Sequence, residues 1–179
     1  MIRARLNIDM KDDAPDYPAL MVVDHILGGG ALSSRLGDRL RVKDGVSYSV
    51  GSWLRVDETD NAGSWEISAT AAPQNLSKAE TGIREELARA FKDGFTAEEV
   101  KAAIASLLEE RSQDRAQDWM VASRWSKLLE LNKKFTDREQ KLDDDIAAVS
   151  LESANAALRK YIDPAKLTVA IAADPAKRK

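Results

Sequence analysis

Apolar and polar residues alternate strictly along residues 2–10. The apolar members fall on one side of an extended chain, and they are Ile2, Ala4, Leu6, Ile8 and Met10. Successive side chains of a strand point to opposite faces of a sheet. The pattern therefore predicts a strand with one buried face and one face in solvent.

Helical spacing replaces this alternation over residues 17–27, where one apolar stripe is made of Leu20, Val23 and Leu27. Three consecutive glycines then interrupt the pattern. Glycine is costly inside a helix and free to adopt unusual backbone angles. We therefore interpret as a hinge between two helices the run Gly28, Gly29 and Gly30.

A second, shorter helix is predicted after the glycines, with an apolar face that recurs every four residues and consists of Leu32, Leu36 and Leu40. Gly45 is predicted to end this helix, and a new alternation begins at Tyr48. Arg41 lies near the end of the helix, and Tyr48 lies at the start of the strand. This arrangement can bring a guanidinium and a phenol to the same surface.

The strand that begins at Tyr48 continues to about residue 57, and a polar loop turns it back into a second strand over residues 64–72. We predict a β-hairpin. Trp53 and Trp65 lie on it, and we interpret both as packing residues, across the pair or under a helix, rather than as a base-stacking or cofactor site.

Residues 77–162 are predicted to be mostly helical. Capping boxes indicate three helix starts, at Ser77 with Glu80, Thr96 with Glu99, and Thr136 with Glu139. Ser150 is predicted to cap a last helix. The polar stretch over residues 109–118 is either the exposed middle of one long helix or a break between two, and we interpret its charges as a solvated face.

Residues 167–173 form a closing apolar strand, which we predict inside the sheet rather than at its edge. The order is thus strand, two helices, hairpin, several helices, strand. We predict a single α+β domain over residues 1–179, in which a mostly antiparallel sheet of about four strands packs against a helical layer.

Composition removes several classes of function. The chain has 27 basic and 30 acidic residues, which gives a net charge of −3, and the charges are interspersed, so no nucleic-acid partner is expected. There is no cysteine, hence no disulfide or thiolate chemistry. No apolar run approaches the roughly 18 residues of a membrane span. Because Met1 abuts a strand without a signal peptide, the chain could be a piece of a longer one, and both periplasm and cytoplasm stay open.

Candidate catalytic groups are few. A catalytic zinc needs about three protein ligands, whereas His25 is the only histidine, so we expect no metal and no cofactor in this chain and interpret His25 as structural. A Ser-His-Asp arrangement with His25 lacks any G-x-S-x-G context. The glycine run matches neither phosphate-binding pattern, because no Lys-Ser or Lys-Thr follows it and Ser33 occupies the position of the third glycine.

One run carries a resemblance. The sequence LGGGALSSRLGDRLRVKDGVSYSVGS, residues 27–52, resembles the signature of the non-catalytic half of M16 (insulinase-type and pitrilysin-type) zinc metallopeptidases. In that family a Gly-rich joint and a Ser-Arg-Leu lead to an Arg, with a Tyr seven residues later, and Arg41 and Tyr48 match this spacing. The ending LRKYIDPAKLTVAIAADP, residues 158–175, resembles the family's closing helix, turn and strand. Val42 departs from the family's usual Glu, which weakens any claim for a partner of Arg41 but leaves the pair intact.

The resemblance implies the fold of an M16 peptidase domain, of the LuxS-like metallohydrolase type. It implies two homologous halves around a chamber, with the zinc on the other half, bound by an H-x-x-E-H helix and a downstream Glu. Arg41 and Tyr48 would then hold the backbone of a peptide substrate near the scissile bond. The expected partner is the catalytic half, in the same parent chain or a companion subunit, and this chain alone is expected to be inactive.

Two alternatives stay open for the chain. It could be a structural or assembly module of an inactive M16 relative, as in family members that became subunits of membrane-bound complexes. It could also be an unrelated α+β binding module. For the two residues, the alternative is that Arg41 forms a local salt bridge and that Tyr48 is a half-buried strand aromatic.

Overall fold

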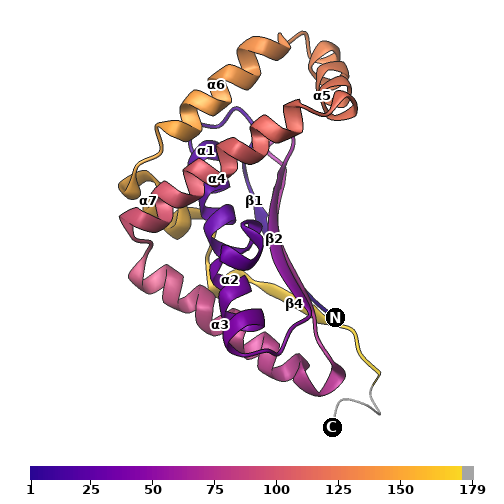
Figure 1. The fold of residues 1–179 in the computed structure, drawn as a ribbon, viewed down its shortest axis with the longest axis vertical. Helices are drawn as coiled ribbons and strands as arrows, with labels where there is room; N and C mark the ends of the chain where they lie inside the picture. Colours follow the sequence, from indigo (N-terminus) through magenta and orange to yellow (C-terminus); the bar gives the residue numbers. More distant parts are fainter. Residues whose placement is uncertain (175–179) are drawn as a thin grey trace.

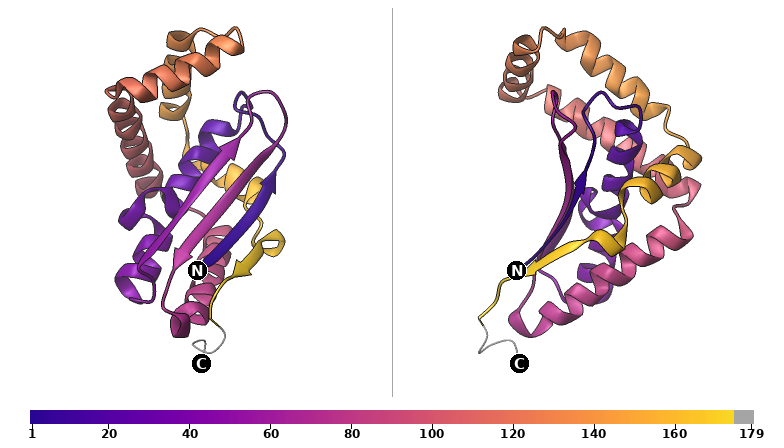
Figure 2. Two further views of the ribbon diagram at one scale, coloured as in Figure 1. Left: turned by 90° about the vertical axis from the view of Figure 1, so that its right-hand side faces the viewer. Right: turned by 180° about the vertical axis from the view of Figure 1, so that it is seen from behind.

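The computed structural model describes residues 1–174 and contains a four-stranded antiparallel sheet with helices on one face (Figures 1 and 2). The strands are β1 Ile2–Ile8, β2 Ser49–Val56, β3 Gly63–Thr70 and β4 Thr168–Ile171. They lie in the order β2-β3-β1-β4. The predicted α+β class is confirmed. Pro175, the last residue of the closing run, lies outside the described residues.

The helices of the layer are α1 Tyr17–Asp24, α2 Arg35–Gly37, α3 Leu76–Asp93, α4 Ala97–Arg115, α5 Asp118–Glu130, α6 Phe135–Ala147 and α7 Leu151–Tyr161. Two π-helical segments, His25–Gly29 and Asp38–Lys43, continue α1 and α2. Short 3₁₀ turns lie at Ala31–Ser33, Pro73–Asn75 and Pro164–Lys166. No helix in residues 1–174 is long and apolar enough to cross a membrane.

The alternation along β1 is confirmed, because its residues are buried and exposed in turn. The buried members face apolar residues of β3 in register, as in the pairs Ala4 with Ile67 and Leu6 with Trp65. Helices α1, α3 and α7 contribute the other side of this core, with side chains that include Leu20, Val23, Ile83, Leu87 and Leu158. Within residues 1–174 the opposite face of the sheet carries no helix (Figure 2, left).

The position of β4 corrects the sequence-based prediction, because among the strands of residues 1–174 it lies at the edge of the sheet and pairs only with β1. Val169 and Ile171 are partly buried against the core, whereas Thr168 and Ala170 are exposed. The run looked continuously apolar because alanine counts as apolar, yet alanine tolerates either face of an edge strand.

Two of the predicted capping boxes are also wrong. Helix α3 begins at Leu76 after a 3₁₀ turn, so Ser77 lies inside it, and α6 begins at Phe135 with no side-chain cap. The box of Thr96 with Glu99 is confirmed, and Ser150 caps α7 as predicted.

The polar stretch over residues 109–118 is a break, because α4 ends at Arg115 and α5 begins at Asp118. Its interpretation as a solvated face fails at Arg111, which is 6% exposed and forms ion pairs with Glu139 and Asp143 of α6. Helix α6 folds back against α4 and brings these carboxylates to the arginine. The sequence motif gave Glu139 a capping role, but the tertiary fold uses it as a counter-ion.

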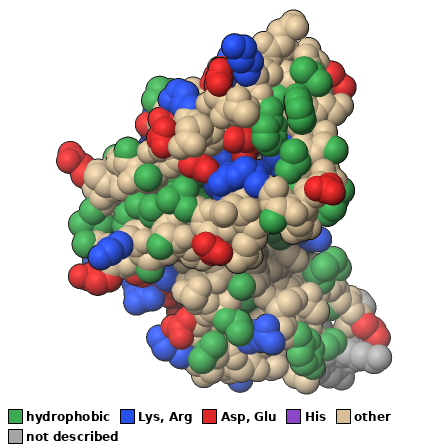
Figure 3. Space-filling view, turned by 45° about the horizontal axis from the view of Figure 1, so that its top comes forward, with side chains coloured by type: hydrophobic (Ala, Val, Ile, Leu, Met, Phe, Trp, Pro, Cys, Tyr) green, Lys and Arg blue, Asp and Glu red, His purple; other side chains and the backbone are tan. Residues whose placement is uncertain are grey.

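Helix α5 lies beyond the hairpin end of the sheet, where Lys127 forms a 3.0 Å ion pair with Glu58 in the β2–β3 loop (Figure 1). Hydrophobic side chains gather at this end of the molecule (Figure 3). The helix exposes Trp119, Trp125 and Leu129.

The two hairpin tryptophans lie on opposite faces. Trp65 is fully buried beneath α1, and its Nε1 donates a 2.7 Å hydrogen bond to Asp24. Ser52 donates a second bond to the same oxygen, at 2.5 Å. Trp53 pairs with Glu66 in the register, so it points to the uncovered face. The two rings therefore cannot pack across the hairpin, and only Trp65 lies under a helix.

Burial raises the pKa of Asp24, despite the hydrogen bonds from Ser52 and Trp65. The folded chain thus holds a proton that the unfolded chain releases near pH 4. The resulting stabilisation is complete below that pH and is lost as the pH rises through the folded-state pKa. Asp24→Asn keeps an acceptor oxygen but cannot titrate, so we expect this variant not to lose stability in this way. The free energy of unfolding of the variant minus that of the wild type should therefore increase with pH. Urea titrations at several pH values measure the difference, and a pH-independent difference would contradict the assignment.

Candidate functional site

Ser34 starts the short helix that carries Arg41. Its backbone is extended, and its Oγ accepts a 3.1 Å hydrogen bond from the amide of Gly37. Gly37 packs so closely that an added Cβ would lie 2.1 Å from the carbonyl oxygen of Ala31. The helix therefore begins after Ser34, and residues 31–33 form a separate 3₁₀ turn.

This break corrects the predicted apolar stripe. Leu36 and Leu40 are fully buried, as expected, but Leu32 is 51% exposed. A four-residue spacing aligns side chains only within one continuous helix. Leu32 precedes Ser34 and so belongs to a different turn.

The glycine run contacts the sheet directly. Helix α1 continues through Gly28 as a π-helical segment, and a Cβ on Gly28 would lie 2.7 Å from the backbone nitrogen of Ser52 in β2. Within residues 1–174 only Gly45 and Gly94 among the glycines have positive φ. Close approach to β2 therefore gives a physical reason for Gly28, and the hinge role of the run stays a prediction.

The turn between Arg41 and Tyr48 is fixed by backbone hydrogen bonds. The carbonyl of Leu40 accepts from Val46 at 3.0 Å and from Ser47 at 3.2 Å. The amide of Tyr48 donates to Thr70 of β3 at 2.8 Å. Gly45 has φ +60°, as suits the residue that ends the helix. The two candidate residues thus lie on either side of a turn that is held at both ends, Arg41 on the π-helical segment and Tyr48 directly before β2.

The cations of residues 35–43 differ in their pairing. Arg35 forms an ion pair with Glu99 at 2.7 Å, Arg39 with Glu85 and Asp44 at 3.0 Å each, and Lys43 with Asp38 at 2.6 Å. Arg41 is exposed and has no ion pair or hydrogen bond from its side chain within residues 1–174. The local salt bridge of the alternative interpretation is absent from this part of the chain.

Tyr48 is 70% exposed, so it is not a half-buried strand aromatic, and its hydroxyl has no partner in the described part of the chain. Val42 and Leu32 are also exposed, at 63% and 51%. Residues 32–48 therefore present two hydrogen-bonding side chains without partners in residues 1–174, next to exposed apolar side chains. Such a surface suits a polypeptide ligand, whose backbone can accept the hydrogen bonds while its binding covers the apolar side chains.

The residues present do not fit a zinc ion. His25 is 6% exposed, and its Nδ1 lies 3.9 Å from the carboxylate of Glu110. In residues 1–174 no group of three or more His, Cys, Asp or Glu side chains is placed to hold a metal.

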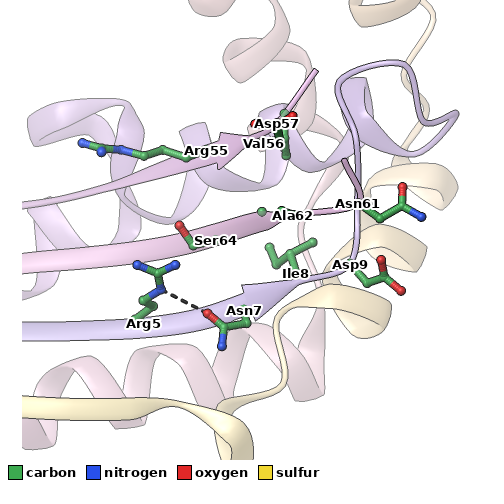
Figure 4. A pocket seen from close by; sticks show the side chains of 11 residues that line it. Arg5, Asn7, Ile8, Asp9, Arg55, Val56, Asp57, Asn61, Ala62 and Ser64 are labelled. Atoms are coloured by element: carbon green, nitrogen blue, oxygen red, sulfur yellow. Dashed lines mark hydrogen bonds between the residues drawn. The ribbon is translucent and has the colours of Figure 1, made fainter. Parts of the chain in front are cut away.

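A separate hollow of about 630 Å³ lies on the uncovered face of the sheet (Figure 4). Its walls include Arg5 and Asp9 from the β1 side and Arg55 and Asp57 from the β2 side, with Ser64 of β3 between them. Arg55 lies at the opposite end of β2 from Tyr48, roughly 20 Å along the strand. Sequence reasoning did not single out this hollow. The polar residues at the outward positions of the alternating strands could have indicated it.

Comparison of the sequence with models of protein families identifies the family of this chain. The model of the peptidase M16 inactive domain matches residues 5–107, which is more than half of the chain. This chain belongs to the peptidase M16 inactive domain family. The matched part contains both Arg41 and Tyr48, and the resemblance to the non-catalytic M16 half is confirmed.

Solved structures share the fold. The peptidase M16 inactive domain from Pseudomonas fluorescens is 22% identical with a TM-score of 0.75, over 94% of this chain and 39% of that chain. The inactive peptidase domain of a Bordetella parapertussis protein named as a zinc protease is 18% identical with a TM-score of 0.75, over 94% and 90%. A chain of Complex III2 from Candida albicans is 16% identical with a TM-score of 0.75, over 94% and 41%.

These identities establish likeness of fold alone. The M16 inactive domain spans about two fifths of the Pseudomonas chain, so the larger part of that chain lies outside the match. A comparison with curated proteins finds no match.

Proposed function

We propose that this M16 inactive domain is the substrate-holding, non-catalytic half of a zinc metallopeptidase. Arg41 and Tyr48 bind the backbone of a peptide near the scissile bond, and the zinc lies on the partner half. One observation carries the proposal: Arg41 is left without an acidic partner in residues 1–174, while the neighbouring cations Arg35, Arg39 and Lys43 are all paired.

The chemistry of the two groups suits a peptide. A guanidinium offers five N–H donors in a fixed plane and a phenol offers one O–H, and both can donate to a peptide carbonyl or to the oxyanion that forms on attack. Their backbone is already held by the bonds of Leu40 and Thr70, so little ordering remains when substrate binds.

The exposed apolar residues near Arg41 would favour hydrogen bonding to a bound peptide. Val42 and Leu32 would be covered when the catalytic half or the peptide lies over this surface. Removing water lowers the local dielectric, which makes each hydrogen bond to the peptide worth more. Zinc bound to the partner half would polarise the substrate carbonyl or activate a water, and the residues of this chain would hold the peptide in position.

A second candidate is a purely structural or assembly role in a larger complex. The fold likeness to a chain of Complex III2 from Candida albicans favours it. In that role Arg41 and Tyr48 would bind no substrate, and the surface would serve contact between subunits.

The isolated chain is expected to retain no stoichiometric zinc after dialysis and to cleave no peptide, because it lacks a set of ligands in residues 1–174. Mixing it with a catalytic half that carries an H-x-x-E-H helix should restore cleavage that a chelator abolishes. Metal analysis and a fluorogenic peptide library provide both readouts. Zinc-dependent cleavage by the isolated chain would overturn the proposal, and a stable complex without cleavage would favour the assembly role.

A further inference from the structure

The uncovered face of the sheet carries a cluster of arginines around one aromatic ring. Arg3 and Arg5 of β1 and Trp53 and Arg55 of β2 alternate with residues of the core face, so all four point away from the helices. We call these four residues the Trp53 platform.

The ring of Trp53 on β2 contacts arginines of two strands, Arg55 of β2 itself and Arg3 of β1. Its centroid lies 5.1 Å from Cζ of Arg3 and 6.0 Å from Cζ of Arg55. Because β3 separates β2 from β1, the ring and Arg3 meet diagonally across β3, where Glu66 lies opposite Trp53 and the small Ser68 lies opposite Arg3. Cation–π contact holds both guanidinium groups beside the indole and leaves their N–H donors available.

Pairing on this face is incomplete. Arg5 forms a 3.2 Å ion pair with Glu66, but Arg3 and Arg55 have no carboxylate partner within the described residues. The chain as a whole has a net charge of −3, so two unpaired arginines at one place are a local excess of positive charge. A ligand that complements them is anionic, and the planar guanidinium fork matches a carboxylate.

The other carboxylates of the face lie toward the hairpin loop. Asp57 accepts hydrogen bonds from the amides of Thr59 at 2.7 Å and Asp60 at 3.0 Å, and Asp9 lines the same hollow (Figure 4). These charges repel an anion from the loop beyond Arg55, so the bound segment is expected to extend from Arg55 toward Arg3. They also disfavour a continuous phosphate backbone, and one tryptophan is a poor stacking surface for successive bases.

We propose that the Trp53 platform binds the carboxylate side chains of an acidic polypeptide segment in extended conformation. Alternate side chains of such a segment lie on the same side at a spacing of about 7 Å, so two of them can reach Arg3 and Arg55 together. The site stands independently of the proposed function. If that function holds, the ligand is an acidic stretch of the peptide substrate.

The test uses the isolated chain and a short, dye-labelled peptide of alternating Glu and Thr, with a Lys–Thr peptide of equal length for comparison. Fluorescence anisotropy at low salt should report binding of the acidic peptide alone, weakened by added salt. Arg3→Glu and Arg55→Glu should each weaken binding by about fivefold or more. Lys101→Glu makes the same charge change at an exposed position of α4, and it should leave the affinity within about twofold of the wild-type value.

Nuclear magnetic resonance locates the site, because the indole N–H of Trp53 should shift on titration while that of Trp65 stays unchanged. Absence of binding, or equal weakening by Lys101→Glu, would overturn the proposal. Stronger binding of single-stranded DNA than of the acidic peptide would assign the face to nucleic acid instead. Peptidase activity does not enter these readouts, so loss of the proposed function leaves this inference separately testable.

Discussion

Replacing Leu40 with alanine is expected to lower the free energy of unfolding by about 2 to 5 kcal/mol. Leu40 is fully buried on the π-helical segment, and a Cβ on Gly82 of α3 would lie 2.6 Å from its Cδ2. The backbone around it is held by the bonds of its own carbonyl to Val46 and Ser47, which limits collapse into the cavity. Both the lost transfer energy and the cavity therefore contribute.

Leu32→Ala is the matched control, because it removes the same atoms from a leucine that is 51% exposed, on the preceding 3₁₀ turn. We expect a change within about 0.5 kcal/mol. Urea denaturation with an unchanged m-value gives both numbers. Equal losses in the two variants would indicate that the leucines form one buried stripe after all.

Strands and their faces could be predicted from the sequence because they depend on local alternation. The pattern of β1 directs Ile2 and Leu6 to the core and Arg3 and Arg5 to the other side, and the structure agrees. The hairpin followed from the same rule. The M16 resemblance rested on two runs, of which residues 27–52 lie inside the matched family model and residues 158–175 lie outside it.

Features that depend on distant partners could not be predicted in this way. Glu139 looked like a helix cap, and only the return of α6 against α4 makes it a counter-ion of Arg111. Leu32 looked like part of a helical face, but it is separated from that face where Ser34 Oγ accepts a hydrogen bond from the amide of Gly37 and starts a new helix.

The candidate site shows the same division. Sequence spacing placed Arg41 and Tyr48 on two sides of one turn. It could not show that Arg35 and Arg39 are neutralised by Glu99 and Glu85 of other helices, because these partners are far away along the chain. The unpaired state of Arg41 is therefore a property of the fold, and the role of the pair stays a prediction.

Removing either candidate group from a reconstituted two-half enzyme is expected to lower kcat by about 10² to 10³, the typical cost of one preorganised donor to a developing oxyanion. Tyr48→Phe removes only the hydroxyl. Arg41→Lys keeps the charge but loses the planar fork. Both side chains are exposed and without partners in residues 1–174, so folding and zinc content should be unchanged.

Tyr161→Phe is the control, because it removes a hydroxyl whose partner is Asp16, away from the candidate surface. Activity should stay at the wild-type level in this variant. An effect of the candidate variants on KM alone would assign Arg41 and Tyr48 to uniform substrate binding rather than to the transition state.

The most direct measurement is the turnover number of the two-half enzyme with Tyr48→Phe, at saturating peptide and with zinc occupancy matched to wild type. Our account of the M16 inactive domain as the substrate-holding half predicts a loss of about 10²-fold or more with no change in the unfolding midpoint. Wild-type turnover in this variant, and in Arg41→Lys, would contradict it and leave the two residues as surface groups of an assembly module.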